Sequence, residues 1–310
     1  MIWLFEQMFV ISQLKMSTNP STTMKRFLTL AVALIALCAH GASMQQMRFH
    51  CERDTSDINT LLEKGLSSGI SNAGGLVVFY ANQLLGTPYV GHTLDGEHEM
   101  LTINIHQLDC TTFVETLYAL TRTTLDGRRS WRDYAARLEN VRYRGGVMGD
   151  YSSRLHYISE WIIDNNSRGN LVEVTADMPH AKYQVKTINF MTTHVTSYVS
   201  LKSDPAMVER IRVAEQKLLN HRMPVLAKSW LGNKNVKAAL HEGDFVGLVT
   251  KVEGLDISHL GIIVKDEQGD PHLLDASMRG GKVMLEAKPL KEYLSGSKST
   301  TTAVRLFRIK

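Results

Sequence analysis

The stretch HQLDCTTFVETLYAL, residues 106–120, contains both a helix start and one face of a buried helix. Asp109 is a favourable N-cap residue, because its carboxylate can accept a hydrogen bond from a free amide of the first turn. The apolar residues that follow recur at spacings of three and four, as on the buried face of a helix: Phe113, Val114, Leu117 and Leu120. The pattern predicts a helix that begins at Cys110 and packs against a core.

Helical patterns also flank this segment on both sides. Upstream, INTLLEKGL (58–66) and LVVFYANQLLG (76–86) are followed by the stop signals Gly86 and Pro88. Downstream, residues 122–144 are charged and helical in part, and AMVERIRVAEQKLLN (206–220) has a helical pattern. A further helix is expected to start at Ser152 or Ser153, with an apolar face made by Leu155, Ile158, Trp161 and Ile162.

The period of the hydrophobic pattern changes in the C-terminal part of the chain. Short β-branched segments bounded by Gly, Asp or Pro predict antiparallel strands. These segments are FVGLVTKV (245–252), ISHLGIIV (257–264), HLLDAS (272–277) and TTAVRLFRI (301–309). Helices that precede a group of strands predict an α+β fold.

Composition and motifs exclude several classes of function. The hydrophobic fraction of 44% is sufficient for a sizeable core, and 35 Lys and Arg against 31 Asp and Glu leave no basic footprint for nucleic acid. Among twelve histidines there is no HExxH, and CxxC, GxSxG, a P-loop and a dinucleotide fingerprint are also missing from the sequence. We therefore expect neither a nucleic-acid or nucleotide partner nor a metal or other cofactor.

The N-terminal segment has the layout of a secretory signal peptide. MKRFLTLAVALIALCAHGAS (24–43) has two cations, an apolar run too short to span a bilayer comfortably, and small residues at its end. Residues 1–43 are thus expected to be an upstream segment and a signal peptide, cleaved near residues 41–43. We predict a secreted or periplasmic protein without a transmembrane segment in the mature chain. A lipid anchor at Cys38 is less favoured, because the bulky Leu37 precedes it.

Two interpretations of Cys110 follow from its position. Cysteine is often buried, and Cys110 is in phase with the apolar stripe, so it can be a core residue. The start of a helix also favours a thiolate, which is the nucleophilic form of a thiol. A third possibility is a disulfide with Cys51, since the mature chain would hold these two cysteines in an oxidising compartment.

A histidine and a carboxylate on neighbouring strands could complete a catalytic site. If residues 257–264 and 272–277 form a hairpin with Val264 opposite His272, His259 and Asp275 lie diagonally on one face. Asp275 could then orient the His259 imidazole, and Gly261 is expected to leave space beside the ring. A slip of one residue would bring His272 to His259 instead.

Several motifs together resemble those of a known protein family. They are GTPYV (86–90), LDCTTFVE (108–115), SHLGIIV (258–264) and LLDAS (273–277), and they occur in the order found in the NlpC-like cysteine peptidases. YRGGVMGDYSSRLHYISEWI (143–162), NFMTTH (189–194) and GLDISHLG (254–261) resemble the N-acetylmuramoyl-L-alanine amidase-like subfamily. The resemblance implies a permuted papain-like fold, with a helical N-terminal part packed on an antiparallel sheet or barrel. It also implies a single domain over residues 44–310 with a helical insertion at about 128–240.

The resemblance assigns roles to particular residues. Cys110 corresponds to the nucleophile and His259 to the general base and acid, while Asp275 stands where the superfamily often has a histidine. Tyr89 corresponds to a tyrosine of the family that lies near the nucleophile. Its phenol could help to stabilise the oxyanion formed in the reaction. The remaining candidates would bind substrate: Asp109, Arg154, His156, Tyr157 and Ser258. Two of these have simpler alternative explanations, since Asp109 already caps a helix and Arg154 could lie at an exposed helix N-terminus.

The implied reaction is hydrolysis of the bond between N-acetylmuramic acid and L-alanine in peptidoglycan or released muropeptides. An alternative within the superfamily is an endopeptidase that cuts the stem peptide after γ-D-glutamate. Because Asp275 departs from the usual third residue, a catalytically silent muropeptide-binding module is a further alternative.

Overall fold

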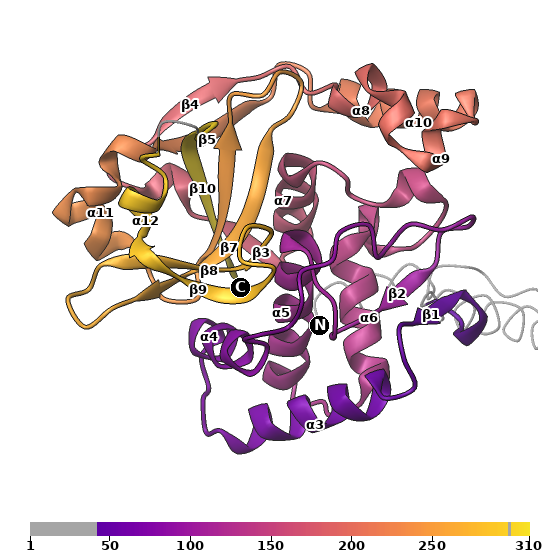
Figure 1. Cartoon of the computed structure of the whole chain (residues 1–310), viewed down its shortest axis with the longest axis horizontal. Helices are drawn as coiled ribbons and strands as arrows, with labels where there is room; N and C mark the ends of the chain where they lie inside the picture. The colour runs from indigo at the N-terminus through magenta and orange to yellow at the C-terminus, as the bar shows by residue number, and fades with distance from the viewer. Residues whose placement is uncertain (1–41, 297–298) are drawn as a thin grey trace, which may run out of the picture. The chain divides into compact units, whose positions relative to one another are not determined.

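Helix α5 (Cys110–Leu125) lies at the centre of the helical part of the molecule (Figure 1). Three helices pack against it, namely α3 (Asp54–Ser67), α4 (Ala73–Gln83) and α6 (Trp131–Arg142). The sequence predicted helices in all four regions, and it predicted the start of α5 at Cys110 with Asp109 as its N-cap.

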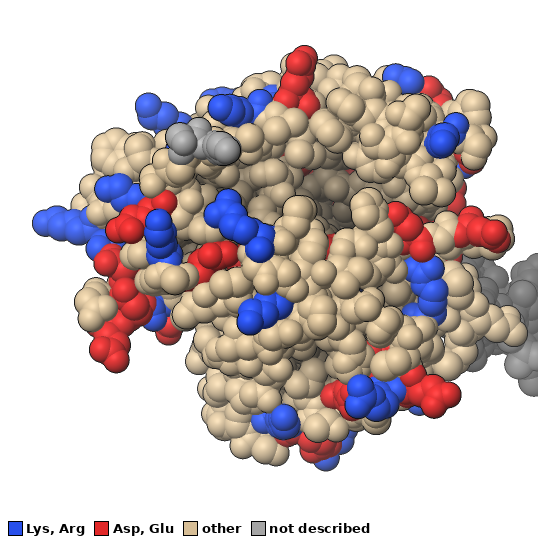
Figure 2. Space-filling view, viewed as in Figure 1, with Lys and Arg blue, Asp and Glu red and all other residues tan. Residues whose placement is uncertain are grey.

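This computed structural model describes residues 42–296 and 299–310. The expected upstream segment and signal peptide, with Cys38, lie outside the described residues apart from Ala42 and Ser43. Within the described ranges, no helix is both long and apolar enough to cross a membrane. On the face shown in Figure 2, acidic and basic side chains are interspersed, in keeping with the net charge of only +4.

Helix α5 is buried on almost every side, which the sequence pattern did not predict. The expected apolar stripe is confirmed, because Phe113, Val114, Leu117 and Leu120 are fully buried. The remaining faces are buried too and carry threonines, such as Thr121 and Thr123. A buried threonine hydroxyl can bond back to its own helix, as Thr123 Oγ1 does in donating to the Ala119 carbonyl at 2.7 Å. These residues therefore tolerate burial although a hydrophobicity pattern marks them as polar.

A buried ion pair between Glu115 of α5 and Arg142 of α6 offers a test of this packing. Arg142 Nε donates to Glu115 Oε2 at 2.7 Å, and Arg142 Nη1 donates to the Thr102 carbonyl at 2.9 Å. Burial raises the pKa of Glu115, and Arg142 opposes that shift. Arg142→Leu would leave the Glu115 carboxylate buried without its partner, so we expect the free energy of unfolding to fall by about 3–5 kcal/mol. Urea denaturation measures this change.

The double variant Glu115→Leu/Arg142→Leu is the matched control for this prediction. Replacing both charges by apolar groups removes the unpaired charge, so the double variant should be more stable than Arg142→Leu alone. Equal losses in the single and double variants would contradict the assigned cause.

The antiparallel sheet predicted from the C-terminal part is present, with more strands than expected. Strand β10, the last along the chain, lies in its interior between β5 and β6, and β3 also pairs with β10. The order is β4, β5, β10, β6, β7, β8, β9, and every neighbouring pair is antiparallel. The bounds are β3 (Leu171–Glu173), β4 (Lys182–Val185), β5 (Arg222–Ala227), β6 (Phe245–Thr250), β7 (Ile257–Lys265), β8 (Pro271–Ser277), β9 (Lys282–Pro289) and β10 (Thr301–Ile309).

Alternating side chains of this sheet belong to two hydrophobic clusters. Ile262 and Leu274 pack in the cluster that contains the helical core, and α5 lies against β7 and β8. Ile263 and Leu273 pack in a second cluster, which includes residues of α11 (Lys234–Ala239) and α12 (Leu290–Tyr293). The sheet thus holds β7 and β8 directly beside the helix that starts at Cys110.

The helix expected to start at Ser152 or Ser153 begins later, so that prediction was wrong. Helix α7 spans Ile158–Ser167, whereas Tyr151–Ser153 form a 3-10 turn capped by Asp150. Between the two the chain is extended, and the Leu155 amide donates to the Arg142 carbonyl at 3.0 Å. Pairing with residues 142–143 therefore overrides the helical pattern from Arg154 to Tyr157.

Within residues 128–240, where the sequence indicated an insertion, two kinds of packing occur. Helices α6 and α7 contribute Tyr134 and Trp161 to the main core. A third cluster joins Tyr157 to Ile188, Met207 and other residues up to Met223. It is built around α8 (Phe190–Thr193), α9 (Val199–Lys202) and α10 (Pro205–Lys217).

A two-stranded parallel pair was not expected from the sequence. Strands β1 (Met47–Phe49) and β2 (Leu101–Ile103) pair with Met47 opposite Leu101. The His50 amide extends the pairing by donating to the Ile103 carbonyl at 3.1 Å. The pair brings the segment before α3 next to the loop that leads into α5.

Candidate active site

Cys110 is held at the first position of α5 by reciprocal hydrogen bonds of the preceding cap. Asp109 Oδ1 accepts from the Thr112 amide at 2.7 Å, and Thr112 Oγ1 accepts from the Asp109 amide at 2.9 Å. Cys110 is partly exposed and packs against the main core. Both cysteines of the described residues are free, so the disulfide alternative was wrong. Cys110 is thus anchored against the core and still partly accessible to solvent.

The β7–β8 hairpin adopts the predicted register, with Val264 opposite His272. His259 Nε2 bonds to Asp275 Oδ2, and Asp275 is completely buried. The alternative partner, His272, is occupied elsewhere, because its Nδ1 lies 2.9 Å from the Glu286 carbonyl and its Nε2 lies 3.3 Å from Asp266 Oδ2. Asp275, and not His272, is therefore the residue that contacts His259.

Two details of strand β7 differ from expectation. Gly261 does not leave open space, because a Cβ there would lie 3.0 Å from Asp275 Cβ and 2.9 Å from the Leu274 carbonyl oxygen. The glycine instead permits the close approach of β8 that brings Asp275 to His259. A bulge between β6 and β7 lies at the step from Ile257 to His259, and Ile257 packs with Leu260 in the main core. Strict alternation along the strand would put Ile257 on the face of His259, and the bulge moves it to the opposite face, that of Leu260.

The surroundings of His259 favour its protonated ring. Burial opposes the charge, but interactions with Cys110 and Asp275 outweigh burial and raise the pKa of His259 from 6.5 to about 10. Since Nε2 contacts Asp275, Nδ1 is the ring nitrogen left for Cys110. At neutral pH the imidazolium can therefore stabilise a Cys110 thiolate and later donate a proton.

Tyr89 lies alongside the segment that precedes Cys110. It forms an isolated parallel bridge with Leu108, and its amide donates to the Gly281 carbonyl at 2.9 Å. Burial, followed by the charges of Cys110 and Asp109, raises the pKa of Tyr89 to about 12. Its phenol therefore remains a hydrogen-bond donor at neutral pH.

Two adjoining cavities open at His259. One, of about 300 Å³, is lined in part by Ser258, His259, Arg279 and Tyr293. The other, of about 350 Å³, also contains His259, Arg279 and Tyr293 and adds Asp275 to its lining. Ser258 is thus placed next to His259, on an exposed part of β7. Space for a substrate lies beside the imidazole and an arginine.

Arg154 is buried and not at an exposed helix N-terminus, so that alternative was wrong. Its Nη2 donates to Glu99 Oε2 at 3.0 Å, and its guanidinium lies 4.9 Å from the centre of the Tyr151 ring. Its Nε is buried and has no hydrogen-bond partner among the described residues. Arg154 and Glu99 line a cavity of about 650 Å³, to which α10 contributes Met207.

His156 and Tyr157 have their polar atoms engaged within the protein. His156 Nε2 donates to the Tyr151 carbonyl at 2.8 Å, and burial followed by the charge of Arg154 lowers the pKa of His156 to about 3. The Tyr157 hydroxyl donates to Glu215 Oε1 at 2.8 Å and accepts from the Met191 amide at 2.8 Å. These contacts join the segment before α7 to α8 and α10.

Comparisons with known proteins agree with the resemblance in the sequence. A family model described as N-acetylmuramoyl-L-alanine amidase-like matches residues 80–301, which include Cys110, His259 and Asp275. The chain belongs to this amidase-like family. Membership supports a peptidoglycan amidase-like function and suggests a hydrolase.

Several solved structures are similar to this amidase-like chain. An N-acetylmuramoyl-L-alanine amidase from Bacteroides uniformis is 32% identical with a TM-score of 0.70, over 77% of this chain and 99% of that chain. A Bacteroides fragilis protein named as a candidate xylanase is 34% identical with a TM-score of 0.67, over 74% of this chain and 99% of that one. A Legionella pneumophila protein shares the fold at 18% identity, with a TM-score of 0.64 over 84% and 95% of the two chains. A search of curated proteins gave no match.

Replacement of Tyr89 tests its role in an amidase-like site. Tyr89→Phe removes only the hydroxyl, and loss of one oxyanion donor typically lowers kcat by about 10²-fold. We expect a loss of that order in kcat with a smaller change in KM, measured with a soluble muropeptide substrate. Tyr118→Phe is the matched control, because Tyr118 is a buried tyrosine of α5 whose pKa burial also raises to about 12. Equal activity of Tyr89→Phe and Tyr118→Phe would contradict the role.

Three residues that line the cavities at His259 and Arg154 were not predicted from the sequence. Glu99 pairs with Arg154, while Arg279 and Tyr293 line the cavities beside His259. Glu99 precedes β2, Arg279 lies in the turn between β8 and β9, and Tyr293 lies in the short helix α12. None of them lies in a motif, so only the tertiary fold associates them with Arg154 or His259.

Proposed function

We propose that this protein is an exported cysteine amidase that cleaves the bond between N-acetylmuramic acid and L-alanine in peptidoglycan or released muropeptides. The observation that carries the proposal is the convergence of Cys110, His259 and Asp275 from three separate segments of an amidase-like chain. Export rests on the signal-peptide layout of residues 24–43.

In the proposed mechanism, the Cys110 thiolate attacks the lactyl carbonyl carbon of the muramoyl group. The oxyanion accepts hydrogen bonds from backbone amides at the start of α5 and from the Tyr89 phenol. His259 donates its proton to the departing L-alanine amine as the carbon–nitrogen bond breaks. Water then attacks the thioester while His259 removes a proton, which releases the lactyl carboxylate and restores the thiolate. Asp275 orients His259 and stabilises its charged form throughout.

We also propose that the fold is a circularly permuted papain-like fold, comprising residues 44–310 with an insertion at about 128–240. Support comes from the nucleophile at a helix start beside an antiparallel sheet that carries the base and its orienting residue. The insertion contributes Met207 to the cavity of Arg154. Arg154, whose Nε has no partner within residues 42–296 and 299–310, is proposed to bind a carboxylate of the stem peptide.

The chemistry of the site favours an amidase over a glycosidase, the activity suggested by the name of the Bacteroides fragilis relative. Glycoside hydrolysis generally uses two carboxyl groups, one on each side of the scissile bond. Beside Cys110 the orienting carboxylate is that of Asp275, which is completely buried and bonded to His259. A thiol with an imidazole suits acyl transfer instead.

Defined muropeptides that carry both sugar and stem peptide test the proposal. After incubation with the wild-type protein, mass spectrometry should detect a free stem peptide that begins with L-alanine, together with the intact sugar bearing its lactyl carboxylate. A stem peptide cut after γ-D-glutamate would show an endopeptidase instead. Binding of muropeptide without any product would show a silent binding module.

A further inference from the structure

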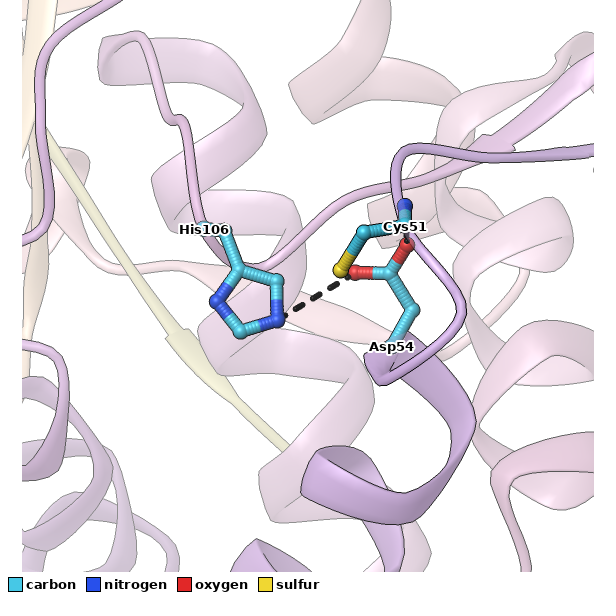
Figure 3. A group of neighbouring side chains, drawn as sticks. All are labelled: Cys51, Asp54 and His106. Atoms are coloured by element: carbon cyan, nitrogen blue, oxygen red, sulfur yellow. Dashed lines mark hydrogen bonds and ion pairs between the residues drawn. The ribbon is translucent and has the colours of Figure 1, made fainter.

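A second group of chemically reactive side chains lies outside the candidate active site. Cys51, Asp54 and His106 each bring one potential ligand atom to within 4.8 Å of the others (Figure 3). Cys51 lies in the turn between β1 and α3, and Asp54 is the first residue of α3. His106 comes from the loop between β2 and α5, so two segments far apart in the sequence form the group.

Two of these ligand atoms are buried and unsatisfied. Asp54 is completely buried, and its Oδ2 accepts from the Cys51 amide at 2.7 Å. The other oxygen, Oδ1, and His106 Nε2 are buried without a hydrogen-bond partner among the described residues. They lie 3.6 Å from each other, as the dashed line in Figure 3 marks. Buried polar atoms are normally satisfied, so this arrangement calls for a ligand that both atoms can share.

Helix capping explains only part of this arrangement. Asp54 and Asp57 lie in the first turn of α3, where carboxylates are favourable, and Asp54 Oδ2 accepts from the Cys51 amide of the preceding turn. Capping does not account for Oδ1 of Asp54, which points toward the imidazole and the Cys51 thiol. The convergence of sulfur, nitrogen and oxygen on one point therefore needs a separate cause.

The spacing and types of these atoms suit a tetrahedral metal ion. Nitrogen and oxygen ligands about 2.0–2.1 Å from a tetrahedral Zn²⁺ lie roughly 3.3 Å from each other. His106 Nε2 lies 3.6 Å from Asp54 Oδ1, which is close to that spacing. A set containing a thiolate and an imidazole favours zinc over magnesium or calcium, which prefer oxygen ligands.

We propose that Cys51, Asp54 and His106 bind a zinc ion, with the fourth coordination position left for a water molecule. The bond between Asp54 Oδ2 and the Cys51 amide orients the carboxylate for this purpose. Asn104 Oδ1 accepts from the His106 and Gln107 amides at 3.0 and 2.9 Å, which fixes the loop that carries the histidine. The ion links the segment before α3 to the loop that leads into Cys110. The sequence shows no conventional zinc motif because the ligands come from two distant segments.

Zinc content and affinity test this site without reference to hydrolysis. The full chain is equilibrated with Zn²⁺ against a chromophoric chelator, and bound metal is measured by mass spectrometry. Wild type should bind one zinc ion per chain, while Cys51→Ser and His106→Gln should weaken binding by at least about tenfold. Cobalt in wild type should show thiolate-to-metal charge transfer and intense tetrahedral d–d bands, and Cys51→Ser should lose the charge-transfer band.

Cys110→Ser is the control that separates this site from the candidate active site. It should keep the zinc affinity and the cobalt spectrum of wild type, because Cys110 is not a ligand. Loss of zinc in Cys110→Ser with retention in Cys51→Ser would assign the metal to the catalytic thiol and overturn the proposal. Failure of wild type to bind zinc would overturn it as well.

Thermal unfolding of wild type keeps the test independent of how well the variants fold. Chelation of zinc should lower the Tm of the wild-type protein by several degrees, because a ligand bound only to the folded state stabilises it. An unchanged Tm after complete removal of bound zinc would contradict a metal that links these two segments.

Discussion

Replacement of Cys110 by alanine should abolish hydrolysis of muropeptides while leaving the protein folded. Loss of a catalytic nucleophile lowers kcat by a factor on the order of 10⁶ in a well-studied hydrolase, which here means activity below detection. The fold should persist, because Cys110 is partly exposed and the helix start is held by the bonds between Asp109 and Thr112. Product formation is followed by mass spectrometry, and folding by thermal unfolding monitored with circular dichroism.

One outcome for Cys110→Ala would contradict this prediction. Activity above about a hundredth of the wild-type rate would be far too high for a missing nucleophile and would contradict the thiolate mechanism. In that case the family membership would still stand, since it rests on the whole of residues 80–301. A wild-type protein that cleaves the muramoyl amide together with an inactive Cys110→Ala variant would support both the bond and the nucleophile.

Asp275→Asn should lower kcat by about 10²–10⁴-fold and change the pH dependence of the residual activity. Asp275 is one of the groups that raise the pKa of His259 to about 10, so its loss lowers that pKa. The imidazolium is the required acid, and activity is therefore lost as pH rises through the pKa of His259. We expect the alkaline limb of kcat/KM near pH 10 in wild type and at lower pH in Asp275→Asn.

Asp266→Asn is the matched control for Asp275→Asn. Asp266 also pairs with a histidine of the same hairpin, at 3.3 Å from His272 Nε2, but that pair lies outside the site. This control should retain wild-type kcat and the wild-type alkaline limb. An alkaline limb in Asp275→Asn that coincides with that of wild type would show that Asp275 does not act through His259.

Local signals in the sequence predicted the parts of the site that depend on neighbouring residues. The Asp109 cap fixed the position of Cys110 on its helix, and the hairpin register that joins His259 to Asp275 was one of the two that the sequence left open. Side chains alternate along a strand, so a correct register places every residue of the hairpin on a definite face. The bulge before His259 was not visible in the pattern, and it moved Ile257 to the other face.

Long-range packing determined the features that the sequence did not reveal. The partner of Arg154 is Glu99, which belongs to the segment before β2, and the partner of Glu115 is Arg142 on another helix. The parallel pairing of β1 with β2 places Cys51 beside His106, although each appears unremarkable in its own segment. Single-segment patterns carry no information about such partners.

The place of β10 inside the sheet determines the order in which the chain can fold. Strands β5 and β6 are made first during synthesis, yet they flank β10 and do not pair with each other. Until residues 301–309 have left the ribosome, both strands present unpaired edges and the sheet cannot be completed. The nascent chain therefore exposes these edges until its last strand has been made, which leaves it dependent on protection from aggregation.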